Sequence, residues 1–132
     1  MRLLISAVLA LIFAPTIAFA QDVSGLWQTE PGDTGGFLHV AIGPCGDNIC
    51  GTIRTAFDGD RSVISDYEHQ GKQLIWDMAA DGANAWKSGK IWAPDRDKTY
   101  RSKMAVSGDR LKVSGCVAGG LICPSQNWVR VQ

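Results

Sequence analysis

Short segments in which apolar and polar residues alternate make up most of this chain, and turn-forming residues separate them. About eight such segments can be counted, and no stretch of ten or more residues repeats its apolar positions at helical spacing. The segments comprise residues 24–30, 37–42, 49–56, 71–78, 86–92, 100–106, 111–117 and 126–131. Short strands at even spacing are typical of a β-sandwich or an up-and-down barrel. We therefore expect an all-β fold, and the preferred architecture is a small antiparallel barrel of about eight strands.

The first and last segments contain residues suited to closing such a barrel. Gly25 and Trp27 lie in the first segment, and Trp128 and Arg130 lie in the last. If the two strands are neighbours, the Trp27 indole can stack on the Arg130 guanidinium, a contact worth about 0.5–2 kcal/mol. We expect these four residues to hold the two ends of the sheet together.

The N-terminal residues have the pattern of a secretory signal peptide. Met1-Arg2 gives a positive start, residues 3–14 are almost wholly apolar, and Ala18-Phe19-Ala20 supplies small residues at a cleavage position. Pro15 interrupts the apolar run well short of the roughly 20 residues that a membrane span needs. We therefore predict that residues 1–20 are removed and that residues 21–132 form one periplasmic or secreted domain. Position 21 is Gln, so we do not expect a lipoprotein.

The charges of the predicted mature chain are nearly balanced. Without the signal peptide, 12 Lys and Arg residues face 13 Asp and Glu residues. The cations form no excess and no run along the sequence. We therefore expect no nucleic-acid partner and no electrostatic attraction to an anionic membrane surface.

Four cysteines in a small exported chain indicate a disulfide framework. A Gly-Gly pair suited to a two-residue hairpin turn lies midway between Cys116 and Cys123. Cys45 and Cys50 bracket a four-residue turn. Neither spacing is Cys-x-x-Cys, which disfavours a zinc or redox site. We predict the pairs Cys45–Cys50 and Cys116–Cys123, each stabilising the fold by roughly 2–2.5 kcal/mol.

Aromatic residues are concentrated in the middle segments. Trp76, Trp86 and Trp92 fall in consecutive predicted strands, near Tyr100. An eight-stranded barrel has an interior that side chains can fill or that can hold one small ligand. These four residues therefore either fill the core or line a pocket for a small, partly apolar ligand. Core filling is preferred, because so short a barrel has little volume to spare.

Three further expectations concern single segments. Alternation in residues 71–78 places Leu74, Trp76 and Met78 on one face of a strand. His39 lies in an apolar strand pattern, so we interpret it as half-buried and not catalytic. Residues 57–70 are polar and lack an apolar face at helical spacing, so we expect a long loop there.

Several motifs agree in order and spacing with one known family. They are Gly25-x-Trp27, Pro44-Cys45 before Cys50-Gly51-x-Ile53, Gly71-Lys72, Gly89-Lys90-Ile91 before Pro94, Lys98-Thr99-Tyr100, Gly115-Cys116, and Gln126-x-Trp128-x-Arg130. Together they resemble a small exported bacterial family known as domain of unknown function 2147, over nearly all of the predicted mature chain. The resemblance implies a lipocalin-like barrel of the calycin superfamily and supplies no catalytic residue. Arg96-Asp97 stands where the family often has a glycine, which leaves the tightness of that turn open.

The sequence carries no motif of the common enzyme classes. It has no Gly-x-Ser-x-Gly, no His-Glu-x-x-His, no phosphate-binding loop and no dinucleotide fingerprint. Asp58-x-Asp60 and Asp95-x-Asp97 lack further ligands nearby, so we expect no metal site and no cofactor. An enzyme is the least favoured class. The preferred function is an exported lipocalin-like protein that binds a small, partly apolar or amphipathic ligand, and the alternative is a ligand-free envelope module whose 57–70 loop contacts an unknown protein partner.

Overall fold

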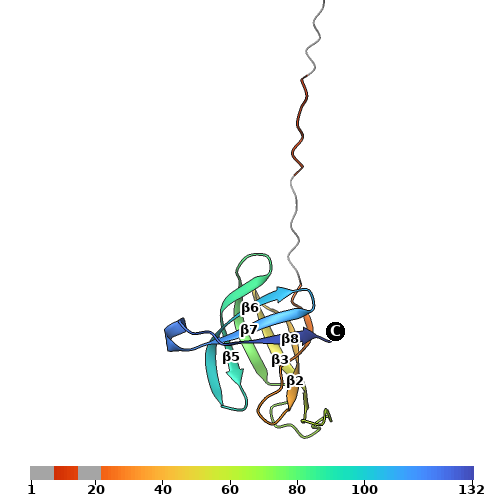
Figure 1. The fold of residues 1–132 in the computed structure, drawn as a ribbon, viewed down its shortest axis with the longest axis vertical. Helices are drawn as coiled ribbons and strands as arrows, with labels where there is room; N and C mark the ends of the chain where they lie inside the picture. The colour runs from red at the N-terminus through yellow and green to blue at the C-terminus, as the bar shows by residue number, and fades with distance from the viewer. Residues whose placement is uncertain (1–7, 15–21) are drawn as a thin grey trace, which may run out of the picture.

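The computed structural model describes residues 8–14 and 22–132, and within them eight antiparallel strands close into a barrel (Figure 1). Each strand pairs with its neighbours in sequence, and the last strand pairs with the first. The strands are β1 (Gly25–Gln28), β2 (Phe37–Cys45), β3 (Asn48–Phe57), β4 (Gln73–Ala80), β5 (Ala85–Ala93), β6 (Lys98–Ser107), β7 (Arg110–Cys116) and β8 (Ser125–Arg130), with a 3₁₀ turn η1 (Ala118–Gly120) between β7 and β8. The predicted all-β, up-and-down barrel is confirmed.

The predicted signal peptide is only partly described. Residues 8–14 are exposed and form neither helix nor strand. The remainder of residues 1–20 and the predicted cleavage position before Gln21 lie outside the described residues. No helix in the described ranges is long and apolar enough to cross a membrane.

The seam between β1 and β8 is built around Arg130. Trp27 is the direct cross-strand partner of Arg130, and the guanidinium carbon lies 4.3 Å from the centre of the indole ring. The same guanidinium donates hydrogen bonds to the carbonyls of Ser24 and Asp22, both at 2.8 Å. A Cβ at Gly25 would lie 2.8 Å from Arg130 Nη1, so this close approach requires glycine. Arg130 therefore satisfies backbone groups at the end of the barrel as well as stacking on Trp27.

Side chains fill the barrel interior. A Cβ added at Gly89 would lie 2.5 Å from Met78 Sδ, and one at Gly51 would lie 3.1 Å from Val40 Cγ1. The interior thus has no room for one more methyl group at Gly89, and at Gly51 it would hold one only if the Val40 side chain shifted. The buried cluster comprises Val23, Trp27, Val40, Ile42, Ile53, Leu74, Ile75, Met78, Trp86, Trp92, Met104, Val106, Leu111, Val113 and Trp128. Core filling, the preferred interpretation of the aromatic content, agrees with this packing.

Two bulges correct the expected alternation in the middle of the sheet. Asp77 in β4 and Ser88 in β5 have positive φ values of 57° and 61°, and the strand registers shift beside them. An extra residue at a bulge changes which side chains face inward. Leu74 and Met78 are buried as expected, but Ile75 joins them and Trp76 is only half-buried. The prediction that Trp76 shares a face with Met78 is therefore wrong.

Both predicted disulfides, Cys45–Cys50 and Cys116–Cys123, are present. The turns that they close differ from expectation. Cys45 pairs with Asn48 across a two-residue turn, where four residues were expected. In the other hairpin Val117 pairs with Ile122, so the turn has four residues and not the two glycines alone. Ala118 takes a positive φ of 54° ahead of the glycines and lengthens this turn.

The stretch between β3 and β4 is a loop, as predicted, and it packs on the barrel. The Asp58 carboxylate accepts hydrogen bonds from the amides of Asp60 and Ser62, both at 2.9 Å. Farther along, the His69 ring meets the buried Trp92 edge-on with 4.9 Å between ring centres. Lys72 Nζ lies 3.4 Å from the centre of the same indole. This loop therefore covers Trp92.

The turn between β5 and β6 needs no glycine. Asp97 adopts a positive φ of 49°, a conformation that aspartate tolerates better than most residues. The Trp92 indole donates a 2.9 Å hydrogen bond to the Asp97 carboxylate. Trp92 thus helps to hold Asp97 at the position where the resembling family often has glycine.

Candidate functional site

The four aromatic residues that were predicted to line one pocket differ in burial and do not share one pocket. Trp86 and Trp92 are buried members of the core. Trp76 and Tyr100 are half-buried and line a groove outside the barrel. The structure therefore brings two of the four residues together, at a place that the sequence did not predict.

A row of cross-strand partners forms the floor of this groove. Trp76 pairs with Lys90, Lys90 pairs with Arg101, and Arg101 pairs with Cys116. Directly opposed residues in a sheet point to the same face. The face is the outer one, because Ser102 and Met104, which flank the neighbouring outward position Lys103, are buried inside. An indole, an amine and a guanidinium thus lie side by side on the outside of the wall.

The disulfide hairpin, residues 116–123, forms the other side of the groove. It projects from the barrel beyond β7 and β8, and it is seen in dark blue at the left of Figure 1. Ala118, Gly119 and Gly120 have successive positive φ values of 54°, 69° and 91°, which curl its tip. A Cβ at Gly120 would lie 4.0 Å from Arg101 Nη1, so the tip lies close to the Arg101 guanidinium.

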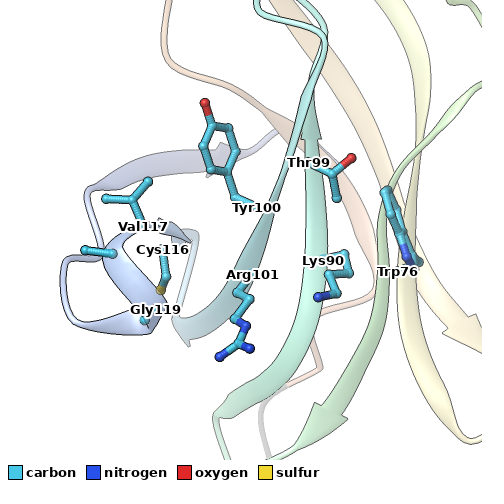
Figure 2. Close-up of a pocket in the computed structure, with 10 residues that line it drawn as sticks. Trp76, Lys90, Thr99, Tyr100, Arg101, Cys116, Val117 and Gly119 are labelled. Atoms are coloured by element: carbon cyan, nitrogen blue, oxygen red, sulfur yellow. The ribbon is translucent and has the colours of Figure 1, made fainter.

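The groove is an open hollow on the barrel surface. Its volume is about 480 Å³. Figure 2 shows Arg101 and Lys90 on the same side of the sheet and Tyr100 directed away from Arg101. The lining residues are Trp76, Lys90, Thr99, Tyr100, Arg101, Cys116, Val117, Ala118, Gly119 and Gly120. Such a surface can stack an apolar ring on Trp76 and neutralise an anion with Lys90 and Arg101.

A second hollow continues the groove along β5 and β6. It has a volume of about 370 Å³ and shares Lys90, Arg101, Cys116 and Gly120 with the first. Lys87 and Lys103 also line it. The Lys87 ammonium lies 3.5 Å from the Asp81 carboxylate. Cations therefore extend along this wall beyond the groove itself.

The fold gathers cations that are scattered in the sequence. Strands β5 to β8 contain eight Lys and Arg residues and, within these four described strands, no Asp or Glu. Residues 85–132 carry nine cations and three acids, whereas residues 22–84 carry three cations and ten acids. We call the outward cations of β5 to β7 the basic wall, which consists of Lys87, Lys90, Arg101, Lys103, Arg110 and Lys112. The cations form no run along the sequence, and strand pairing brings them to one face of the folded chain; charges counted separately for each half of the sequence would have indicated this wall.

Titratable groups with shifted pKa values lie mainly outside the groove. Burial lowers the pKa of His39, and the charge of Arg61 lowers it further. Burial raises the pKa of Tyr67, and Glu68 and Asp95 add to this effect. Both residues belong to the packing around the long loop. A hydrogen bond with Tyr100 raises the pKa of Arg96 and engages the Tyr100 side chain at the edge of the groove.

The groove is lined by cationic, aromatic and hydroxyl groups. Its lining residues include no carboxylate, histidine or free thiol, and Lys90, Arg101, Tyr100 and Thr99 supply its polar side chains. Across residues 8–14 and 22–132, no three His, Cys, Asp or Glu side chains gather as they would around a metal ion. Cys116 lies in the groove but is held in the disulfide with Cys123. Recognition of a ligand is therefore the chemistry that this arrangement supports.

Comparison with solved structures shows a similar fold in a protein of Helicobacter pylori. The structure described as "Protein HP1028 from the human pathogen Helicobacter pylori belongs to the lipocalin family" is similar to this chain with a TM-score of 0.67. The two share 16% sequence identity, and the similarity covers 84% of each chain. Identity this low shows the barrel fold alone. The comparison with curated proteins finds no match.

The sequence also matches a family model along almost the whole barrel. The model is described as "Uncharacterized protein conserved in bacteria (DUF2147)" and matches residues 25–130, from the start of β1 to the end of β8. The matched residues include both ends of the seam and the groove. The chain therefore belongs to the DUF2147 family, and its fold is a lipocalin-like barrel.

Proposed function

We propose that this protein is exported and binds a small, partly apolar molecule with an anionic group in the outer groove. The observation that carries the proposal is the row Trp76–Lys90–Arg101, which places an aromatic surface beside two cations in a groove of about 480 Å³. The filled interior around Gly51 and Gly89 argues against a ligand inside the barrel. Binding on the outside keeps the amphipathic ligand that the sequence suggested and changes its location.

Export is supported by two features of the chain. The N-terminal residues have the charged and apolar regions of a signal peptide. All four cysteines are paired in disulfides, which persist in oxidising compartments outside the cytoplasm. Trypsin shaving of intact cells and fractionation, with the N-terminus read by mass spectrometry, tests this part of the proposal. A protein that stays in the cytoplasm with residues 1–20 attached would contradict export.

Ligand binding is tested with the processed protein purified from cells. Native mass spectrometry should detect a co-purifying mass, or Trp fluorescence should respond to members of a library of aromatic and aliphatic carboxylates. Trp76→Ala should weaken binding roughly tenfold, because it removes both the stacking surface and its contact area. Arg101→Gln should lower the affinity for the anionic members of the library and leave the affinity for their neutral analogues unchanged.

Thr52→Ala provides a matched control for these variants. Thr52 is half-buried in β3, whose neighbours in the sheet are β2 and β4, and it does not line the groove. We expect this variant to bind as the parent protein does. A library without any response, or equal losses in Thr52→Ala and Trp76→Ala, would contradict the proposed site.

The alternative function is a ligand-free interaction module whose 57–70 loop contacts a protein partner. An apolar patch on the 57–70 loop would have favoured this alternative. Within this described loop, Val63 is the one large apolar side chain that is exposed, so the loop carries no such patch. The exposed aliphatic residues gather instead on the disulfide hairpin, which the next subsection considers.

A further inference from the structure

We propose that the disulfide hairpin and the basic wall together form a docking surface for an anionic phospholipid membrane. The proposal does not rest on ligand binding in the groove, and it assigns a separate role to the tip of the hairpin.

The tip exposes aliphatic side chains that a soluble hairpin does not need. Leu121 is 88% exposed and Ile122 is 58% exposed, and Val117 beside them is 40% exposed. All three lie within the loop that the Cys116–Cys123 disulfide closes. The disulfide and the Val117–Ile122 pairing fix the backbone at the base of the tip. Hydrophobic residues held outward on a constrained hairpin can enter an apolar phase without unfolding any strand.

Cations stand directly behind this apolar tip. Gly120 at the tip lies next to the Arg101 guanidinium, and Cys116, Gly120 and Cys123 share one hollow with Lys90 and Lys103. The neighbouring strands β5 to β8 carry no acid among their described residues, so no carboxylate on them opposes an anionic surface. Ten of the 13 acids lie in residues 22–84, and one of these, Asp81, lies 3.5 Å from Lys87 at the edge of the basic wall. The molecule is thus electrically polarised, with one side suited to an anionic surface.

An aliphatic tip backed by Lys and Arg matches the two layers of a membrane surface. Aliphatic side chains enter the boundary between headgroups and acyl chains, while Lys and Arg remain at the level of the anionic headgroups. A polyanion such as a nucleic acid would use the cations and gain nothing from Leu121 and Ile122. The coincidence of both features on one hairpin therefore favours a lipid surface.

The test measures binding of the processed protein to vesicles of two compositions. Flotation with vesicles of equal parts phosphatidylglycerol and phosphatidylcholine is compared with flotation on phosphatidylcholine alone. We expect binding to the anionic vesicles, and we expect it to weaken as salt is raised. The double variant Leu121→Ser with Ile122→Ser should bind the anionic vesicles at least roughly tenfold more weakly than the parent protein. Lys90→Gln with Arg101→Gln should lower the affinity roughly 25-fold, at about fivefold for each cation.

Matched controls lie elsewhere on the barrel. Val63→Ser removes another large apolar side chain, which is 59% exposed on the β3–β4 loop, and Arg54→Gln removes an exposed cation of β3. Both should leave vesicle binding unchanged. Hydrogen exchange should show that anionic vesicles protect the amides of residues 117–122 and spare those of residues 57–72.

Each contrary result overturns the proposal. Absence of flotation with anionic vesicles, or equal flotation on both compositions, excludes docking by charge and apolar insertion together. Retained binding in the double variant at positions 121 and 122 would assign the affinity to charge alone, as for a general polyanion. Equal losses in the control variants, or protection outside residues 117–122, would place the contact elsewhere.

The two proposed roles can be tested separately with Trp76→Ala. We expect this variant to lose ligand binding and to float with anionic vesicles as the parent protein does.

Discussion

Trp86 and Trp92 differ from Trp76 and Tyr100 in how deeply their side chains are buried. The first pair is buried in the core, and the second pair lines the outer groove. All four lie on three adjacent strands, and sequence distance does not separate the pairs. The comparison teaches that a small barrel uses its largest side chains to fill its interior, so that a surface for recognition remains on the outside.

The largest expected effect is on stability and comes from the inner pair. Trp86→Ala should lower the free energy of unfolding by about 3–5 kcal/mol, because it leaves a large cavity that the closed sheet cannot collapse into. Chemical denaturation followed by circular dichroism measures this change. Trp76→Ala is the matched comparison and should cost less, about 1–2 kcal/mol, since the indole is only partly buried where it packs against the core. Equal costs for the two variants would erase the distinction between the inner and outer pairs.

A smaller effect is expected at the seam that keeps the interior closed. Arg130→Ala should destabilise the protein by about 1–3 kcal/mol, because the carbonyls of Ser24 and Asp22 lose their donors and Trp27 loses its cation. Arg130→Lys should cost less, since it keeps the charge and loses the planar stack. In a double-mutant cycle, Trp27→Phe should reduce the cost of Arg130→Ala. Additivity within about 0.3 kcal/mol would show that the two side chains are not energetically coupled.

The fold was predictable from the sequence because barrel-forming signals are local. Alternation and turn residues located the strands, and the short Cys spacings located both disulfides. The inward and outward faces of β4 were not predictable in the same way. The bulges at Asp77 and Ser88 depend on how adjacent strands pair, and a period-2 pattern carries no signal for an extra residue. Trp76 was therefore assigned to the wrong face.

The candidate site was less predictable, because it is assembled from residues far apart in sequence. Trp76, Lys90, Arg101 and Cys116 lie on four strands and become neighbours through strand register. Net charge for the whole chain concealed the basic wall, since the acids of residues 22–84 cancel the cations of residues 85–132. The exposure of the tip was not predictable from residue types, because Leu and Ile are usually buried in β-strands and hairpins.

The smallest expected effect comes from pH, on the outer surface near the long loop. Burial lowers the pKa of His39 below its ordinary value of 6.5, and Arg61 adds to the shift. Below about pH 6.5 the unfolded chain binds a proton that the folded chain does not, so stability falls as the pH drops from 6.5 toward the folded pKa. His39→Gln should flatten the dependence of the denaturation midpoint on pH between about 7 and 5. An unchanged slope would mean that other groups control stability in this range.

The single pairing between strands distant in sequence gives the barrel an uneven assembly. Among the described strands, seven pairings join consecutive strands, and the β1–β8 pairing joins residues about a hundred positions apart. Consecutive hairpins close short loops and form quickly, whereas the final closure orders the whole chain at once. Contacts made late in folding act mainly on the rate of unfolding. If the seam forms last, changes at Trp27 and Arg130 should alter the rate at which the barrel opens more than the rate at which it forms.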